Sequence, residues 1–244
     1  MNFPKHVQEF FSKRKINNDV LQRFGVSWDG HKIIYPVLNG SGQEIFSIYR
    51  RDPRRTAGIK YWYMKGAKVS LYGIDKIKNE KSVLICEGPN DCLAAWSQGI
   101  PAVTSTGGAL SFQKEWAKHF ENKEVIIIFD CDVAGGKGAV KTFEIIPWAK
   151  IGILPDERQK DICDFTTAGG RLSDVMSRAL HYNDIEEVKC DLLFKHARFM
   201  PIFFHEEYIK RHLEITKIAA PHRPNPQITD KITRAKAYPI DGLI

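Results

Sequence analysis

The sequence has no long apolar run. None of its apolar segments approaches the roughly 20 residues that a helix needs to cross a bilayer, and residues 1–6 lack the charged-then-apolar order of a secretion signal. The G-x-x-x-x-G-K-S/T loop, with which nucleotide-driven motors hold triphosphate, is missing as well. We therefore expect a soluble, cytoplasmic protein that has no membrane partner and is not itself such a motor.

Cysteine is scarce, and the spacing of the cysteines does not match a zinc site. The five cysteines are odd in number and form no Cys-x-x-Cys pair, which argues against a disulfide framework and against a zinc ribbon. No zinc is expected in this chain. Cys86, Cys131 and Cys163 lie on or just after predicted structural elements near the acidic residues described below, and we expect them to pack as small apolar side chains in a reducing compartment.

The charge of the chain is unevenly distributed. The 244 residues carry a net charge of +7 and are 43% apolar, which is enough for a core of one large or two small domains. Residues 1–80 contain 15 Lys and Arg against 7 Asp and Glu, whereas residues 81–190 contain 12 against 16. Basic flanks can hold a polyanion while an acidic centre holds metal ions, so this distribution favours an enzyme that acts on phosphodiesters.

Two short apolar runs in the middle of the chain each end at a carboxylate. Residues 83–86 lead into Glu87, and residues 125–129 lead into Asp130 and Asp132. Uninterrupted apolar runs of this length are typical of strands buried on both faces of a parallel sheet. Because sites in such sheets lie beyond the carboxyl ends of the strands, we expect these acids to meet at one edge and to bind a divalent cation.

The spacing of these motifs resembles the TOPRIM domain shared by bacterial-type DNA primases, topoisomerases and some nucleases. The resemblance rests on Glu87-Gly with an Asp in the following helix, on Asp130-x-Asp132 followed by Ala-Gly, and on the later Lys-Asp-Ile-Cys-Asp segment at 160–164. It implies an α/β fold, with a parallel sheet flanked by helices. We expect alternating strands and helices from 83 to 181, with the last helix at 171–181.

The resemblance also implies roles for the acids. Glu87, Asp130 and Asp132 are the expected catalytic residues, with Glu87 as a general acid or base. Asp91 is left open, because it could instead orient a basic residue. Mg²⁺ is the expected ion since all ligands are hard oxygens, and Mn²⁺ is a possible substitute. The expected metal ligands are Glu87, Asp130, Asp132, Asp161 and Asp164.

The residues before the first acidic strand predict a small basic α+β subdomain. Two short helices occupy 1–28, and alternating residues at 32–38 and 44–51 flank a Gly-rich turn, which predicts a hairpin. This outline, with the later Lys-Tyr and Leu-Tyr-Gly elements, resembles the subdomain that precedes TOPRIM in bacterial and bacteriophage primases. The run at 13–15 is interpreted as a solvated face, although a phosphate contact there is open. The expected contacts to nucleotide or nucleic-acid phosphates are Arg50, Arg51, Lys60, Lys65, Lys68 and Lys137.

These observations predict three regions: a basic subdomain at 1–80, a TOPRIM catalytic domain at 81–182, and a helical C-terminal region with a tail at 183–244. The leading hypothesis is a DNA primase catalytic core that makes short RNA primers on a single-stranded DNA template from ribonucleoside triphosphates. A replicative helicase and a separate zinc-ribbon domain are expected partners. A TOPRIM nuclease and a non-catalytic nucleic-acid-binding or helicase-partner module remain alternatives, whereas the chain is too short for a topoisomerase.

Overall fold

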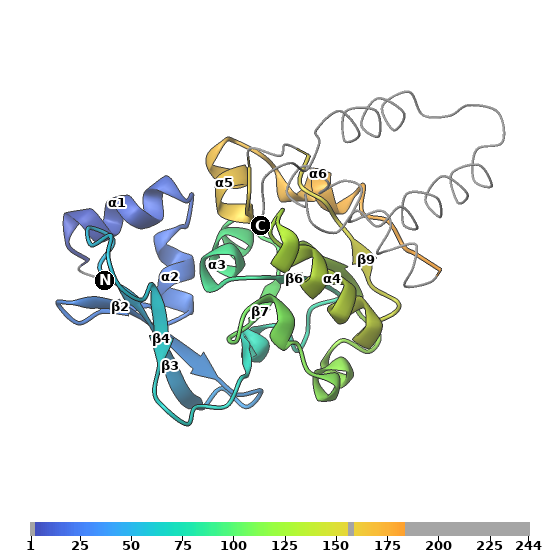
Figure 1. Ribbon diagram of the computed structural model, residues 1–244, viewed down its shortest axis with the longest axis horizontal. Coiled ribbons are helices and arrows are strands. Elements are labelled where there is room, and N and C mark those ends of the chain that lie inside the picture. The colour runs from blue at the N-terminus through green and yellow to red at the C-terminus, as the bar shows by residue number, and fades with distance from the viewer. Residues whose placement is uncertain (1–2, 156–158, 184–244) are drawn as a thin grey trace, which may run out of the picture. The chain divides into compact units, whose positions relative to one another are not determined.

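The computed structural model describes residues 3–155 and 159–183. The helical region predicted at 183–244 lies, apart from its first residue, outside the described residues. Residues 1–185 belong to one compact unit, in which the chain forms two β-sheets (Figure 1). No helix within the described ranges combines the length and the apolar character that crossing a membrane requires.

The first sheet is antiparallel and confirms the predicted hairpin. Its strands, in spatial order, are β1 (Ser27–Trp28), β2 (Lys32–Leu38), β3 (Glu44–Arg51) and β4 (Tyr61–Tyr63). Along β2, buried residues alternate with half-buried ones, and Ile33, Tyr35 and Val37 are fully buried. This alternation follows the period of two in the sequence, because successive side chains of a strand point to opposite faces.

Two helices pack beside the first sheet (Figure 1). They are α1 (Lys5–Lys13), which buries Val7, Phe10 and Phe11, and α2 (Asn18–Arg23). The guanidinium groups of Arg14 and Arg50 lie 3.8 and 4.0 Å from the centre of the Phe10 ring. The contact with Arg50 holds the end of α1 against β3, whereas Arg14 stacks on its own helix.

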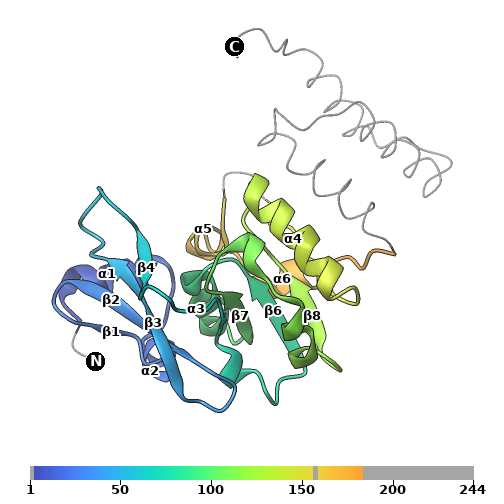
Figure 2. The ribbon, with the colours of Figure 1, turned by 60° about the horizontal axis from the view of Figure 1, so that its bottom comes forward.

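The second sheet is the predicted parallel sheet with one added antiparallel strand. Its strands, in spatial order, are β5 (Leu71–Tyr72), β7 (Ala102–Ser105), β6 (Ser82–Cys86), β8 (Glu124–Ile127) and β9 (Lys150–Ile151). Figure 2 shows β7, β6 and β8 side by side in the middle of the sheet. Residues 83–86 are completely buried, as expected for a strand covered on both faces. Only β5 runs antiparallel, and it pairs with β7.

Helices connect and cover the strands of the second sheet. They are α3 (Pro89–Ser97), α4 (Val133–Ile145), α5 (Ile162–Thr167) and α6 (Leu172–Met176), with the 3-10 turns η1 (Ile74–Lys76), η2 (Ala109–Ser111) and η3 (Lys114–His119). Helix α4 passes very close to the end of β8. A Cβ atom on Gly135 would overlap the carbonyl oxygen of Asp130, so this approach requires glycine.

The last predicted helix is shorter than expected. The sequence predicted a helix over 171–181, but α6 ends at Met176. The backbone of Leu180 instead pairs with Ile151, through N–H···O bonds of 3.0 and 2.8 Å. Pairing with the outer strand β9 satisfies backbone groups that a longer helix would have bonded internally.

Candidate active site

A cavity of about 590 Å³ lies between the two sheets, and its two sides carry opposite charges. One side comes from the second sheet and its helices, and we call it the acidic wall. The other side comes from the end of α1 and the start of β4, and we call it the basic wall. The acidic wall comprises Glu87, Asp91, Asp130, Asp161 and Asp164, and the basic wall comprises Lys13, Arg14 and Lys60.

The strand register explains how the acidic wall is assembled. β6 and β8 are parallel neighbours with Ile85 opposite Ile127, so the chain leaves both strands at the same edge, at Glu87 and shortly before Asp130. The third acidic segment is tied to this edge because the N–H of Cys131 donates to the carbonyl of Lys160 at 2.7 Å. The structure thus brings together four of the five predicted ligands, which are Glu87, Asp130, Asp161 and Asp164.

Asp91 belongs to the same site, although the predicted ligand set omitted it. Its carboxylate is buried and accepts the N–H of Cys163 at 3.1 Å. One potential ligand atom from each of Asp91, Asp161 and Cys163 lies within 4.8 Å of the other two. The sequence held a signal for Asp91, because it stands in the first turn of the helix that begins directly after Glu87. The structure pairs it with a backbone amide rather than with a basic side chain.

Asp132 has a different environment from the other predicted ligands. It is the N-cap of α4 and accepts the N–H of Gly135 at 2.9 Å, and it pairs with Lys160 at 2.9 Å. It does not line the cavity. Although partial burial acts in the opposite direction, the Gly135 N–H and the Lys160 ammonium lower the pKa of Asp132.

The surroundings of three carboxyl groups in the acidic wall disfavour their ionised form. Burial, together with the neighbouring carboxylates, raises the pKa of Asp130 to about 8 and that of Asp91 to about 7. Burial and the charge of Asp132 also raise the pKa of Glu87. Three neighbouring carboxyls with raised pKa values favour the binding of a cation, because its positive charge offsets the repulsion between them.

The donor set fits a divalent cation. Oε2 of Glu87 is buried and has no hydrogen-bond partner among the described residues, and the wall offers mainly carboxylate oxygens. Hard oxygen donors suit Mg²⁺ and Mn²⁺, whereas a zinc site would require more nitrogen or sulfur ligands. The residues present therefore fit the cation that their sequence pattern predicts.

The basic wall only partly matches the predicted phosphate contacts. Of the six predicted residues, Lys60 alone lines the cavity. Arg50 is 8% exposed, lies over Phe10 and donates to the carbonyl of Arg51. Arg51 donates to the carbonyls of Thr56 and Gly58. Lys65, Lys68 and Lys137 are exposed outside the cavity lining.

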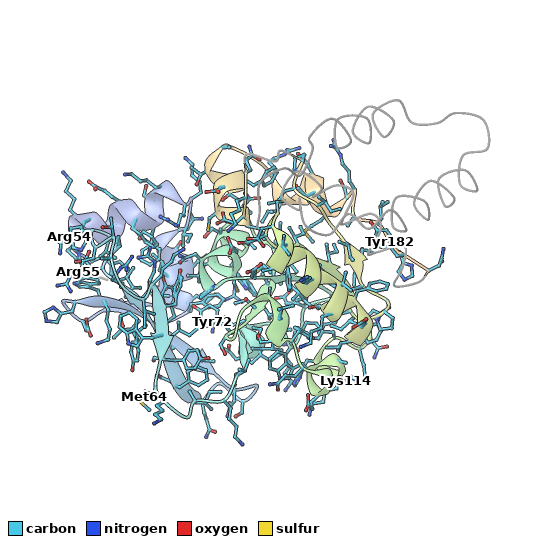
Figure 3. The ribbon with its side chains drawn as sticks, in the orientation of Figure 1. Arg54, Arg55, Met64, Tyr72, Lys114 and Tyr182 are labelled. Carbon is cyan, nitrogen blue, oxygen red and sulfur yellow. The ribbon has the colours of Figure 1, made fainter. Side chains whose placement is uncertain are left out.

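Two basic residues of the wall were not among the six predicted phosphate contacts. Lys13 and Arg14 line the cavity, whereas the sequence favoured a solvated face for this run. By contrast, Arg54 and Arg55 lie beside α1 at the outer edge of the first sheet (Figure 3), where Arg54 pairs with Asp52 at 2.7 Å. Sequence alone does not distinguish these two kinds of basic run, because both are short and polar.

A family model described as Toprim-like matches residues 84–166. This range begins in β6 and ends in α5, so it includes every residue of the acidic wall. The chain contains a TOPRIM domain. The recognition made from the three acidic motifs is thereby confirmed.

Proteins similar to this chain extend the likeness beyond the TOPRIM domain. The DNA primase of Chlamydia pneumoniae is 27% identical over 160 residues, which cover 58% of this chain and 27% of that protein. The zinc-binding and RNA polymerase domains of the Aquifex aeolicus primase superpose with a TM-score of 0.62 at 17% identity, over 95% of this chain and 70% of that one. A DnaG primase catalytic domain bound to single-stranded DNA gives a TM-score of 0.61 at 18% identity, over 96% and 91%.

These comparisons confirm the fold class, since the TOPRIM domain and the subdomain before it have the fold of primase catalytic domains. The chain spans between a quarter and a third of the length of the curated relatives that it matches.

Proposed function

We propose that this chain is the catalytic core of a DNA primase, which makes short RNA primers on single-stranded DNA from ribonucleoside triphosphates. The proposal rests on one observation: a single cavity has five carboxylates on one side and three basic side chains on the other. Such an enzyme would act in the cytoplasm. A helicase and a zinc-binding domain are proposed partners, and the similar Aquifex protein carries a zinc-binding domain.

The acidic wall would hold Mg²⁺, for which Mn²⁺ could substitute, through Glu87, Asp130, Asp161 and Asp164 together with Asp91. Bound divalent ions would activate the 3'-hydroxyl of the primer and stabilise the charge on the transferring phosphoryl group. Glu87 would accept or donate a proton, because its raised pKa lies nearer to neutrality than that of an ordinary carboxyl. Asp132 would act beside this group by orienting Lys160 and the start of α4.

The basic wall would hold the negative charge of the reacting nucleotide. Arg14 offers a rigid guanidinium fork that is already stacked on Phe10, and Lys13 and Lys60 add mobile ammonium groups. Arg50 and Arg51 would mainly shape this wall, since their guanidinium groups bond backbone carbonyls. Lys65, Lys68 and Lys137 lie outside the cavity lining, and we propose that they add only a weak, general attraction for nucleic acid.

Primer synthesis on mixed-sequence single-stranded DNA tests the proposal. Purified protein would be incubated with all four ribonucleoside triphosphates, one of them radiolabelled, and with Mg²⁺ or Mn²⁺. We expect labelled oligomers from the wild type and a loss of at least roughly a thousandfold in Asp130→Asn, which keeps the shape of the side chain and removes its charge. Asp19→Asn, at an exposed position of α2, is the matched control and should leave synthesis unchanged.

The same assay separates the alternatives. Metal-dependent shortening of the DNA without labelled oligomers would support a nuclease and contradict the primase proposal. DNA binding without either reaction would support a non-catalytic module.

A further inference from the structure

A chain of hydrogen bonds runs from the interior of the first sheet to the cavity. The hydroxyl of Tyr35 in β2 donates to Oδ1 of Asn90 in α3 at 3.0 Å. The amide Nδ2 of Asn90 then donates to the hydroxyl oxygen of Tyr61 in β4 at 2.8 Å. Tyr35 and Tyr61 belong to the first sheet and Asn90 to α3, so these hydrogen bonds join the first sheet to the helix that follows β6.

The burial of Tyr35 fixes the direction of this chain. Tyr35 is 0% exposed, so its O–H cannot donate to bulk water and needs an acceptor inside the protein. Oδ1 of Asn90 is that acceptor. With the amide reversed, Nδ2 would face the Tyr35 oxygen and the Tyr35 proton would be left unbonded in the interior, which is costly. The amide is therefore held with Nδ2 toward Tyr61.

The fixed amide determines what Tyr61 presents to the cavity. The Tyr61 oxygen accepts from Asn90 and also interacts with the guanidinium of Arg50, which is itself a donor. The Tyr61 proton must therefore point elsewhere, and none of the hydrogen bonds among the described residues uses it. Tyr61 and Asn90 both line the cavity. Burial raises the pKa of Tyr61 to about 12, so the hydroxyl stays protonated at neutral pH.

The surroundings of Tyr61 select an anionic partner for this proton. Lys60 Nζ lies 5.5 Å from the centre of the Tyr61 ring, and the Arg50 guanidinium lies 5.8 Å from it. Arg14 and Lys13 line the same side of the cavity. Asp91 also lines the cavity, and its charge acts on Tyr61. The four basic groups outnumber it, so this fixed donor is complementary to a phosphate oxygen.

We propose that the Tyr61 hydroxyl donates a hydrogen bond to a phosphate oxygen of the nucleotide in the cavity, and that Asn90 and Tyr35 are positioning residues that keep this donor aimed. The inference rests on the proposed function for the identity of the ligand. It adds a specific contact that neither the acidic motifs nor the basic residues of the sequence predicted.

Equilibrium binding of ATP to the full chain, measured by calorimetry with Mg²⁺ and without template, is the first test. Tyr61→Phe removes only the hydroxyl, and we expect about tenfold weaker binding, since hydrogen bonds to charged groups are the stronger class. In primer synthesis the KM for ATP should rise by a similar factor, while kcat changes less than about twofold. Tyr49→Phe is the matched control, because Tyr49 stacks on Trp62 and does not line the cavity.

A double-mutant cycle tests the positioning role. Tyr35→Phe frees the Asn90 amide to rotate, which lets Tyr61 turn its proton toward Oδ1, and we expect about threefold weaker ATP binding. In the Tyr61→Phe background the same substitution should have no further effect, because there is no proton left to orient. Equal weakening in both backgrounds would show a merely structural role for Tyr35 and would overturn that part of the inference.

The outcomes separate this inference from the proposed function. If wild type and Tyr61→Phe bind ATP equally, the Tyr61 contact is wrong while the primase proposal is untouched. If primer synthesis fails but the cycle behaves as expected, the activity is wrong and the phosphate contact stands. A wild type that binds no ATP at all overturns the inference.

Discussion

The two walls of the cavity are built in different ways. The acidic wall consists of short side chains at the ends of parallel strands and the starts of helices, so the backbone itself places them. The basic wall consists of long side chains from α1 and the segment before β4, and contacts such as Arg14 with Phe10 hold them. The acidic wall is rigid and electrostatically strained, whereas the basic wall is more exposed and adjustable.

This difference suits the two kinds of ligand. A small divalent ion requires several oxygens at fixed positions. In its absence, burial and the repulsion between these carboxylates raise the pKa of Asp130 and Asp91. A nucleotide or a nucleic-acid strand has many phosphates and changes position during synthesis, so mobile ammonium groups hold it with little geometric demand. The acidic wall should therefore tolerate far less change than the basic wall.

Among changes that leave every carboxylate in place, the largest expected effect comes from disturbing the backbone of the acidic wall. Gly135→Ala places a methyl group against the carbonyl of Asp130, so the end of β8 or the start of α4 must shift. We expect primer synthesis to fall by more than about a hundredfold, because small displacements of catalytic groups are costly. The melting temperature should also fall.

Gly136→Ala is the matched control for this substitution. A Cβ at Gly136 would meet nothing within 4 Å, and alanine favours a helix over glycine by roughly 0.5–1 kcal/mol. We expect unchanged activity and a slightly higher melting temperature. Equal behaviour of the two variants would mean that the acidic wall is as adjustable as the basic wall.

The acidic wall was also the part of the site that sequence predicted best. Apolar runs that stop at Glu87 and before Asp130 are local patterns, and strand topology alone brings their ends together. Asp91 had a local signal, but its place in the site depends on how α3 meets α5. The Tyr35–Asn90–Tyr61 chain depends on how the first sheet meets α3, which no local pattern encodes. The helix predicted at 171–181 failed for a similar reason, because Leu180 pairs with a strand that lies distant in sequence.

The pH dependence of stability provides a second, intermediate test of strain in the acidic wall. Unfolded carboxyls ionise near their ordinary value of 3.8, whereas Asp130 ionises at about 8 in the fold. The folded state thus holds protons that the unfolded state has lost, so stability falls as pH rises from about 4 to about 8 and then levels off. We expect the melting temperature of the metal-free protein to fall by about 5 °C between about pH 6 and about pH 8.5.

Mg²⁺ and the substitution Asp130→Asn should each reduce the loss of stability at high pH. Mg²⁺ should raise the melting temperature more at the higher pH, because the carboxylates that bind it are then ionised. Asp130→Asn should flatten the pH dependence relative to wild type, which a series of thermal melts would measure. If the melting temperature of both proteins depended on pH in the same way, the pKa of Asp130 would not be raised in the folded state.

The smallest expected effects concern the basic wall and show whether its position or only its charge matters. Lys13→Gln with Lys60→Gln removes two charges from the cavity, whereas Lys65→Gln with Lys68→Gln removes two exposed charges outside it. We expect the first pair to weaken binding of a single-stranded DNA oligomer about tenfold and to reduce the slope of log affinity against log salt by roughly 1–2. The second pair should weaken binding less than about twofold, with little change in slope.

Fluorescence anisotropy over a range of salt concentrations measures both quantities. If the two pairs weaken binding equally, DNA is held by the general charge of the first 80 residues and the cavity has no privileged basic wall. If only the first pair weakens DNA binding, then phosphate is bound mainly in the cavity, on the side opposite the proposed metal ligands. The walls would then differ in rigidity but share one location, which is the arrangement that template-directed transfer of a nucleotide requires.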